Sequence, residues 1–296
     1  MAVMVLLGAG ASYGSKNVEP SPPPLGNKLF EELVEKGGEA ASMPEFLKEK
    51  FQSNFEEGMA AYFEHTQGDI MTFQRELAEH LASFKPLDGN VYIDLIKSLK
   101  PQRVIYSSLN YDLLFELAAA KLHLNTIYDN GFQNGYVRLL KIHGSSNFWP
   151  DIPMGSMKGC KIYGSGRADI QAPTKPLNQI DTLNRCRVED SLAPAIAMFA
   201  VGKDVRVCPD YVEEQYAKWK EQIEKSSKVF IVGVRVHEVD EHIWGVLGKC
   251  PAKVWYFGFD GDKDEFDAWK AKHKKANAYF RKADFEASID IIKGLA

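Results

Sequence analysis

The chain has 296 residues, of which 45% are hydrophobic and 26% charged, and its formal net charge is −4. This is an ordinary globular composition, and the length fits one large α/β domain or two small ones. Proteins that bind nucleic acid regardless of sequence are usually basic, so the charge balance argues against that role. We therefore expect no direct nucleic-acid binding, although the balance is compatible with a local basic patch.

The sequence predicts neither a secreted protein nor a membrane protein. Met1 to Leu7 is too short for the apolar part of a signal peptide, and no apolar run approaches the ~18 residues of a membrane span. The four cysteines stand apart without a C-x-x-C pair, so a structural zinc site is not expected. We expect a cytoplasmic protein with reduced thiols, no metal and no membrane partner.

The first predicted strand is the uncharged run Met4 to Leu7, which is followed by a glycine-rich segment, Gly8-Ala9-Gly10-Ala11-Ser12. An apolar run of this kind is typical of a parallel strand buried on both faces. Glycines let a ligand approach the backbone, whose N–H groups in such a turn can bind a pyrophosphate. The usual dinucleotide fingerprint has its third glycine where this chain has Tyr13. A tight strand-to-loop turn without a ligand is therefore the alternative.

A long helical region follows the first strand. Pro20 to Gly26 form a rigid loop, and Asn27 can cap the helix after it. From there to Leu99 the patterns are helical, which makes roughly seventy residues before the next strand, far more than a usual crossover. We predict that residues 27–100 form a helical insertion. It is a candidate surface for assembly or gating, with a purely structural role as the alternative.

Strands and helices alternate in the rest of the chain. Four further strands are predicted, at Arg103 to Ser107, Val137 to Ile142, Lys228 to Gly233 and Lys253 to Phe257, with a short one at Asn277 to Phe280. Residues 150–195 are rich in Pro, Gly and Ser and predict an irregular small subdomain, after which Ala195 to Val201 could be a buried strand. The alternation predicts an α/β fold, a Rossmann-like, doubly wound parallel sheet within a single domain of residues 1–296.

Ligands of such sheets bind beyond the carboxyl ends of the strands. Four predicted strand ends carry glycines or polar residues: Gly8 to Ser12, Ser107 to Asp112, His143-Gly144-Ser145, and Gly233. Together they supply a phosphate cradle, a carboxamide, a carboxylate and an imidazole. Their convergence predicts a binding site more strongly than any one of them alone.

Each of these residues also has a purely structural interpretation. Asn110 could cap the helix predicted from Leu113, and a carboxylate at Asp112 favours the helix dipole with or without a ligand. His143 could be a buried, hydrogen-bonded histidine rather than one that faces a ligand. His237 and His242 are five residues apart and lack a partner cluster, so we do not expect them to bind metal.

Three segments resemble, in order, the signature segments of the sirtuin family. They are Gly8-Ala9-Gly10-Ala11-Ser12, Asn110-Tyr111-Asp112 and Lys141-Ile142-His143-Gly144-Ser145. Three more resemble its prokaryotic, defence-associated branch: Pro23 to Leu29, His143 to Trp149, and Ile231-Val232-Gly233 with Asp240 to Ile243. The chain departs from protein-deacylating sirtuins because it lacks the paired cysteines of their zinc module and carries Val234-Arg235 after the late glycine.

The resemblance implies an enzyme that binds NAD+ as its substrate and breaks the bond between nicotinamide and ribose. Gly8, Ala9, Gly10, Ala11 and Ser12 would hold the pyrophosphate, with Gly144 and Gly233 also at the ligand. Asn110 would position the ribose and the attacking water, Asp112 would hold the carboxamide end, and His143 would be the general base or orient a ribose hydroxyl. Cleavage through an oxocarbenium-like species, as in glycoside hydrolysis, needs few groups beyond these.

The implied function is an NAD+ glycohydrolase that depletes NAD+ during anti-phage defence. Such an enzyme would need to be held inactive, so we expect a homo-oligomer or a partner such as an ATPase or a nucleic-acid-guided protein. Two alternatives stay open. One is a protein deacylase or ADP-ribosyltransferase, and the other is a regulatory module that binds NAD or ADP-ribose without cleaving it.

Overall fold

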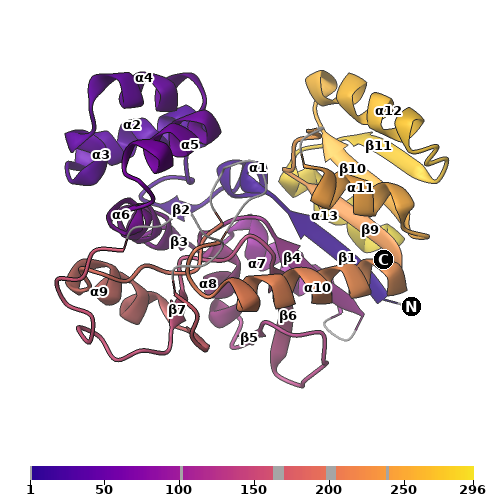
Figure 1. The fold of residues 1–296 in the computed structure, drawn as a ribbon. Coiled ribbons are helices and arrows are strands. Elements are labelled where there is room, and N and C mark those ends of the chain that lie inside the picture. The colour runs from indigo at the N-terminus through magenta and orange to yellow at the C-terminus, as the bar shows by residue number, and fades with distance from the viewer. Residues whose placement is uncertain (1, 101–102, 163–169, 198–204, 238–239) are drawn as a thin grey trace.

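The structure is a computed structural model and describes residues 2–100, 103–162, 170–197, 205–237 and 240–296. The described residues form a seven-stranded sheet in the order β11-β10-β9-β1-β4-β6-β5, and every neighbouring pair is parallel (Figure 1). The strands are β1 (Ala2–Leu7), β4 (Val104–Ser108), β5 (Asn125–Ile127), β6 (Tyr136–Lys141), β9 (Ser226–Val232), β10 (Lys253–Gly258) and β11 (Ala278–Lys282). The predicted doubly wound α/β fold is confirmed.

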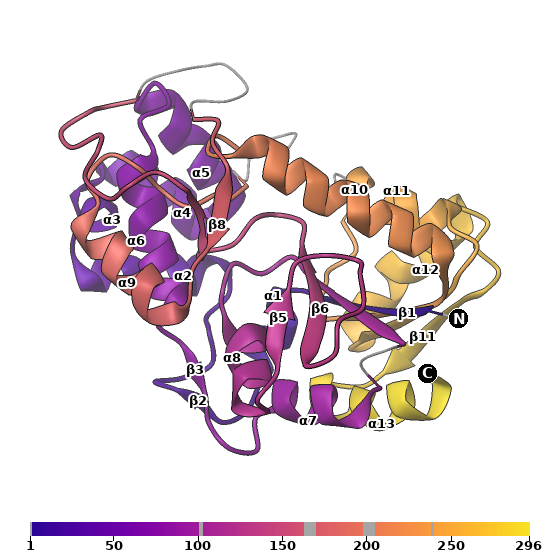
Figure 2. The same ribbon diagram turned by 90° about the horizontal axis from the view of Figure 1, so that it is seen from below.

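Helices cover both faces of the sheet, as Figure 2 shows from below. One layer comprises α7 (Val91–Ser98), α8 (Leu114–Lys121) and α13 (Phe285–Leu295), and the other α10 (Pro209–Lys225), α11 (Glu241–Lys249) and α12 (Lys263–Lys272). Successive side chains of a strand point to opposite faces. Val5 therefore packs with the core under α7, α8 and α13, and Leu6 with the core under α10 to α12. Trp219, Trp244 and Trp269 are buried in that second core.

A group of helices lies beyond the end of β1 in Figure 1. These are α2 (Gly26–Lys36), α3 (Glu39–Ser42), α4 (Glu45–Ser53), α5 (Phe55–His65) and α6 (Met71–Ala82). They pack around aromatic rings, with Phe30 and Phe51 stacked at 4.2 Å between ring centroids. The prediction that Asn27 caps α2 was wrong, because that helix begins at Gly26 and Leu25 stands at its cap without a side-chain hydrogen bond.

Short elements join the helices to the sheet. β2 (Val18–Glu19) pairs antiparallel with β3 (Lys85–Pro86), and β7 (Phe148–Pro150) with β8 (Thr174–Pro176). The segment predicted to be irregular, residues 150–195, contains β8 and the helix α9 (Gln179–Val188). A 3-10 turn, η1 (Asp260–Asp262), precedes α12. In place of the strand predicted from Ala195 there are two isolated bridges, Ile196 with Gly144 and Ala197 with Val205. Residues 198–201 lie outside the described part of the chain.

The glycine-rich segment is not the loop that the sequence predicts. β1 leads directly into α1 (Ala9–Tyr13), a helix of five residues.

Among the described residues, no helix is both long and apolar enough to cross a membrane.

Candidate functional site

The predicted strand ends meet at one edge of the sheet. Leu7 is in register with Ser108 of β4 and with Val232 of β9, and Ser108 is in register with Lys141 of β6. The residues that follow these positions are therefore neighbours. The main chain connects them directly, since the Leu109 amide donates to the Leu7 carbonyl at 2.9 Å.

The glycines at this edge allow the segments that follow β1 and β9 to approach each other closely. A Cβ on Gly233, where φ is +67°, would lie 2.0 Å from the Ala11 nitrogen, and a Cβ on Gly10 would lie 2.9 Å from the Gly233 Cα. The Gly10 amide donates to the Gly233 carbonyl and the Ala11 amide to the Gly8 carbonyl, both at 2.9 Å. The Gly8 amide donates to the Val232 carbonyl, also at 2.9 Å. Three amides of the predicted phosphate cradle are thus already in use, and the phosphate contact of Gly8 to Ser12 stays a prediction.

A hydrogen-bonded network of four buried side chains lies between the ends of β1 and β4. The Ser12 hydroxyl donates to Asp112 Oδ2 at 2.7 Å, and it lies 2.8 Å from the Tyr92 hydroxyl. Asn110 Nδ2 donates to Ser12 Oγ at 2.9 Å. Burial, reinforced by the charge of Asp112, raises the pKa of Tyr92 well above its usual value, so Tyr92 stays protonated and donates to Ser12. Ser12 therefore gives one hydrogen bond and receives two.

The network fixes the orientation of the Asn110 carboxamide. Its Nδ2 donates to the Gly8 carbonyl, which can only accept, as well as to Ser12, both at 2.9 Å. The two N–H bonds are therefore used within the protein. Asn110 Oδ1 is buried and has no hydrogen-bond partner among the described residues. An acceptor in this state is poised for a hydroxyl or a water from outside the protein.

Leu113 stands at the N-cap of α8, and it is Asp112, rather than Asn110, whose side chain binds the first amide of the helix. Its Oδ1 accepts from the Leu114 amide at 3.0 Å, while its backbone carbonyl accepts from Lys141 Nζ at 2.6 Å. The Lys141 side chain is 1% exposed and forms an ion pair at 3.2 Å with Glu116, which is 12% exposed. The capping interpretation of Asn110 was wrong, and Asp112 serves the helix and the network together. Its predicted contact with a ligand is not tested by these bonds.

His143 lies at the end of β6 and contacts a histidine of another element. Its Nε2 is 2.9 Å from Nε2 of His242, in the first turn of α11, and the ring centroids are 5.2 Å apart. His143 is 5% exposed, whereas the His242 side chain is 31% exposed. His242 was not predicted as a residue of the site, although Asp240 to Ile243 is among the segments that resemble the defence-associated branch. An Asp-x-His sequence after a glycine-terminated strand is the only local signal for it.

The backbone around His143 is held by a close approach. Gly144 has φ +80°, and a Cβ there would lie 2.0 Å from the Ala195 carbonyl oxygen. The His143 carbonyl accepts from the Ala197 amide at 2.8 Å, and the Ser145 amide donates to the Ala195 carbonyl at 2.9 Å. Gly144 thus serves the packing of the imidazole-bearing turn, and its contact with a ligand stays a prediction.

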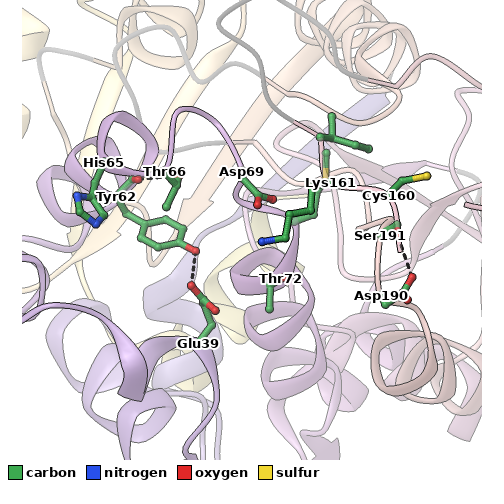
Figure 3. A pocket seen from close by; sticks show the side chains of 12 residues that line it. Glu39, Tyr62, His65, Thr66, Asp69, Thr72, Cys160, Lys161, Asp190 and Ser191 are labelled. Atoms are coloured by element: carbon green, nitrogen blue, oxygen red, sulfur yellow. Dashed lines mark hydrogen bonds between the residues drawn. The ribbon is translucent and has the colours of Figure 1, made fainter. Parts of the chain in front are cut away.

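A cavity of about 310 Å³ lies away from the strand ends (Figure 3). Residues of α3, α5 and α6 line it, together with residues 160–162 and 190–191. Several of its polar groups already bind each other: the Tyr62 hydroxyl donates to Glu39 at 2.9 Å, and the Ser191 hydroxyl to Asp190 at 2.8 Å. It includes none of the strand-end residues. We place the candidate site at the sheet edge, where a buried acceptor is left over.

The described part of the chain contains no group of three or more His, Cys, Asp or Glu side chains that could hold a metal ion. The four cysteines are free thiols, of which only Cys160 is exposed.

No protein-family model matches the sequence, and no curated protein does. The chain is similar in fold to a solved structure described as "Structural Basis for the Mechanism and Regulation of Sir2 Enzymes", with 14% sequence identity and a TM-score of 0.45. That comparison covers 99% of this chain and 90% of the other. At this level the similarity carries no argument about activity.

Proposed function

We propose that this chain is an NAD+ glycohydrolase, which hydrolyses NAD+ to nicotinamide and ADP-ribose. One observation carries the proposal. The Asn110 carboxamide is fixed through both its N–H groups, and its buried Oδ1 is unpartnered among the described residues. It lies where the ends of β1, β4 and β6 meet, and His143 follows the end of β6.

This arrangement suits hydrolysis of an N-glycosidic bond. A fixed acceptor oxygen can hold the attacking water or a ribose hydroxyl in place, which is much of what such a reaction requires. Nicotinamide leaves as a neutral molecule, so no strong general acid is needed. A histidine beside the water can accept its proton as the oxocarbenium-like species is captured.

The identity of the substrate rests on sequence. The segments Gly8 to Ser12, Asn110 to Asp112 and Lys141 to Ser145 resemble the sirtuin signature. In the fold they belong to three adjacent strand ends, which supports one shared ligand. NAD+ would then lie across these ends with its pyrophosphate near α1 and its nicotinamide ribose near Asn110.

The test is nicotinamide and ADP-ribose release by purified wild type, Asn110→Ala and the matched control Asn125→Ala, which alters an exposed asparagine of β5. We expect Asn110→Ala to lower the rate by at least about 10²-fold, since it removes the group that positions the water. Asn125→Ala should keep the wild-type rate. NAD+ that binds without cleavage would favour the regulatory module, and release that requires an acyl-lysine peptide or an acceptor protein would favour the deacylase or transferase.

We also propose that NAD+ depletion by this chain serves bacterial defence against phage, and that self-assembly or a partner protein restrains it. The support is the resemblance of Pro23 to Leu29 and His143 to Trp149 to the defence-associated branch. In infected cells, NAD+ should fall with the wild type but not with Asn110→Ala. Equal NAD+ levels in both strains would contradict this role and leave the in vitro activity unaffected.

A further inference from the structure

The contact between His143 and His242 connects a buried imidazole to one that reaches solvent. We propose that His242 is a positioning residue that receives the proton from His143 and passes it to solvent. This inference rests on the proposed hydrolysis of NAD+.

The geometry of the pair is that of a hydrogen bond between two imidazoles. The two Nε2 atoms are 2.9 Å apart, and the rings are tilted by 34°. Only one proton fits between them, so one ring donates while the other accepts. A proton can therefore cross this contact without any movement of the backbone.

Hydrolysis creates the need for such a path. The bond between C1′ of the ribose and the nicotinamide nitrogen breaks, and its electron pair stays on nicotinamide. The water oxygen bonds to C1′, and one water proton is left over for every NAD+ cleaved. His143 is 5% exposed and is poorly placed to release that proton to bulk water by itself. Since 31% of the His242 side chain is exposed, a proton that crosses to His242 can leave from there.

The surroundings of His242 can stabilise the positive charge that its ring carries while it holds the proton. Asp240 Oδ1 lies 3.9 Å from His242 Nδ1, and a carboxylate at this distance favours the protonated ring. From α10, the Tyr216 hydroxyl donates to the His242 carbonyl at 2.8 Å and keeps the first turn of α11 against the sheet edge. Two imidazoles at this distance could also share a metal ion, but the described residues offer no third ligand group. The geometry therefore favours transfer of a proton.

The experiment compares wild type, His242→Ala and His237→Ala, whose histidine is exposed and lies just before α11. The measurements are kcat and KM for nicotinamide release, NAD+ affinity by calorimetry, and the rate with added free imidazole. We expect His242→Ala to lower kcat by about tenfold to 100-fold, which is a smaller decrease than the loss of a general base causes. The affinity for NAD+ should stay unchanged. Imidazole should restore much of the rate, because the vacated position is open to solvent. His237→Ala should match wild type.

Each contrary result has a distinct meaning. A wild-type kcat in His242→Ala would overturn the proton path alone. A loss of kcat accompanied by weaker NAD+ binding and no rescue by imidazole would assign His242 a structural role and also overturn it. Wild-type activity that disappears with a chelator and returns with zinc would replace the path with a metal site. A wild type that binds NAD+ but never cleaves it would overturn the proposed function, and the proton path with it.

Discussion

The polar side chains at the strand ends form hydrogen bonds with one another. In helices α2 to α6, by contrast, burial shifts the pKa values of several titratable side chains away from their usual values. At the sheet edge, Ser12 links Asn110, Asp112 and Tyr92 through short hydrogen bonds. In the helices, burial raises the pKa of Glu76 to about 7. The cavity of Figure 3 also lies among these helices.

This contrast indicates where the chemistry of the fold is located. The cavity lies among the helices, where burial also shifts the pKa values of Glu76 and His80. A shifted pKa does not by itself mark the site, because burial also raises the pKa of Tyr92 at the sheet edge. Buried polar atoms without a partner occur in both regions, among them Glu76 Oε1 in α6. At the sheet edge, however, the unpartnered acceptor Asn110 Oδ1 belongs to a network whose other polar groups are hydrogen-bonded. If this distinction is right, substitutions at the edge should change activity, and substitutions in the helices should change stability alone.

The largest effect on stability is expected from Lys141→Met. Lys141 is buried, holds the Asp112 carbonyl and pairs with Glu116, so its loss leaves a nearly buried carboxylate unpaired. Removal of one partner of a buried pair costs about 3–5 kcal/mol. We expect a free energy of unfolding lowered by that amount in denaturant titration, together with loss of NAD+ cleavage.

Two controls sharpen this result. Lys141→Met combined with Glu116→Gln removes the unpaired charge and should recover much of the lost stability. Lys121→Met breaks an exposed pair, in which Asp88 is 99% exposed, and should leave the free energy of unfolding almost unchanged. Equal losses for Lys141→Met and Lys121→Met would show that the buried pair has no special role.

A smaller loss of stability, with a clear effect on activity, is expected from Ser12→Ala. The substitution leaves Asp112 Oδ2 and Asn110 Nδ2 each short of one buried hydrogen bond. We expect about 1–3 kcal/mol less stability and a kcat/KM lowered by about tenfold to 100-fold, because the Asn110 carboxamide loses one of its two anchors.

Ser15→Ala is the matched control for Ser12→Ala. Ser15 is 1% exposed and accepts a single bond from Asn90 at 2.7 Å, outside the network. It should lose comparable stability while cleavage continues at the wild-type rate. If both variants lost the same activity, the network would be no more than packing.

Much of the fold follows from the sequence because the larger elements carry regular apolar patterns. β1, β9 and β10 are runs buried on both faces, and each was predicted to within a few residues. α9 was missed because its buried residues are Thr182, Arg185 and Cys186, which make no apolar stripe. The paired strands β2 and β3 have only two residues each, too few to show a period.

The site was predictable only in part, for a related reason. Asn110 and His143 directly follow strands, so the rule that ligands bind at strand ends selects them. Their partners come from distant elements: Tyr92 is 80 residues from Ser12, and His242 is 99 residues from His143. No local pattern encodes such contacts. The role of the glycines also needed the fold, because each closely approaches the backbone of a segment distant in the sequence.

The smallest expected effect is a pH-dependent gain of stability in Glu76→Gln. The folded pKa of Glu76 is about 7, above the ordinary 4.5, because burial disfavours the carboxylate. The folded state therefore holds a proton that the unfolded state has lost, and wild-type stability falls as the pH rises from about 4.5 to about 7. Gln keeps an acceptor for the amides of Glu39 and Ala40 but has no proton to lose. The Tm difference between variant and wild type should be larger at pH 8 than at pH 5.

His80→Gln, on the same helix, tests a pH dependence of stability that runs in the opposite direction. Glu32 Oε2 lies 3.1 Å from His80 Nε2, but burial lowers the pKa of His80 to about 4 and raises that of Glu32, so the ring is neutral at pH 7. In the unfolded chain the ring has its ordinary pKa of 6.5, so it takes up a proton at a higher pH than the folded ring does. Stability is therefore lost as the pH falls from about 6.5 toward 4. His80→Gln should therefore gain Tm on the acid side, Glu76→Gln on the alkaline side, and both should cleave NAD+ at the wild-type rate. Loss of cleavage in either would mean that these helices take part in the reaction, and the contrast between the two regions would fail.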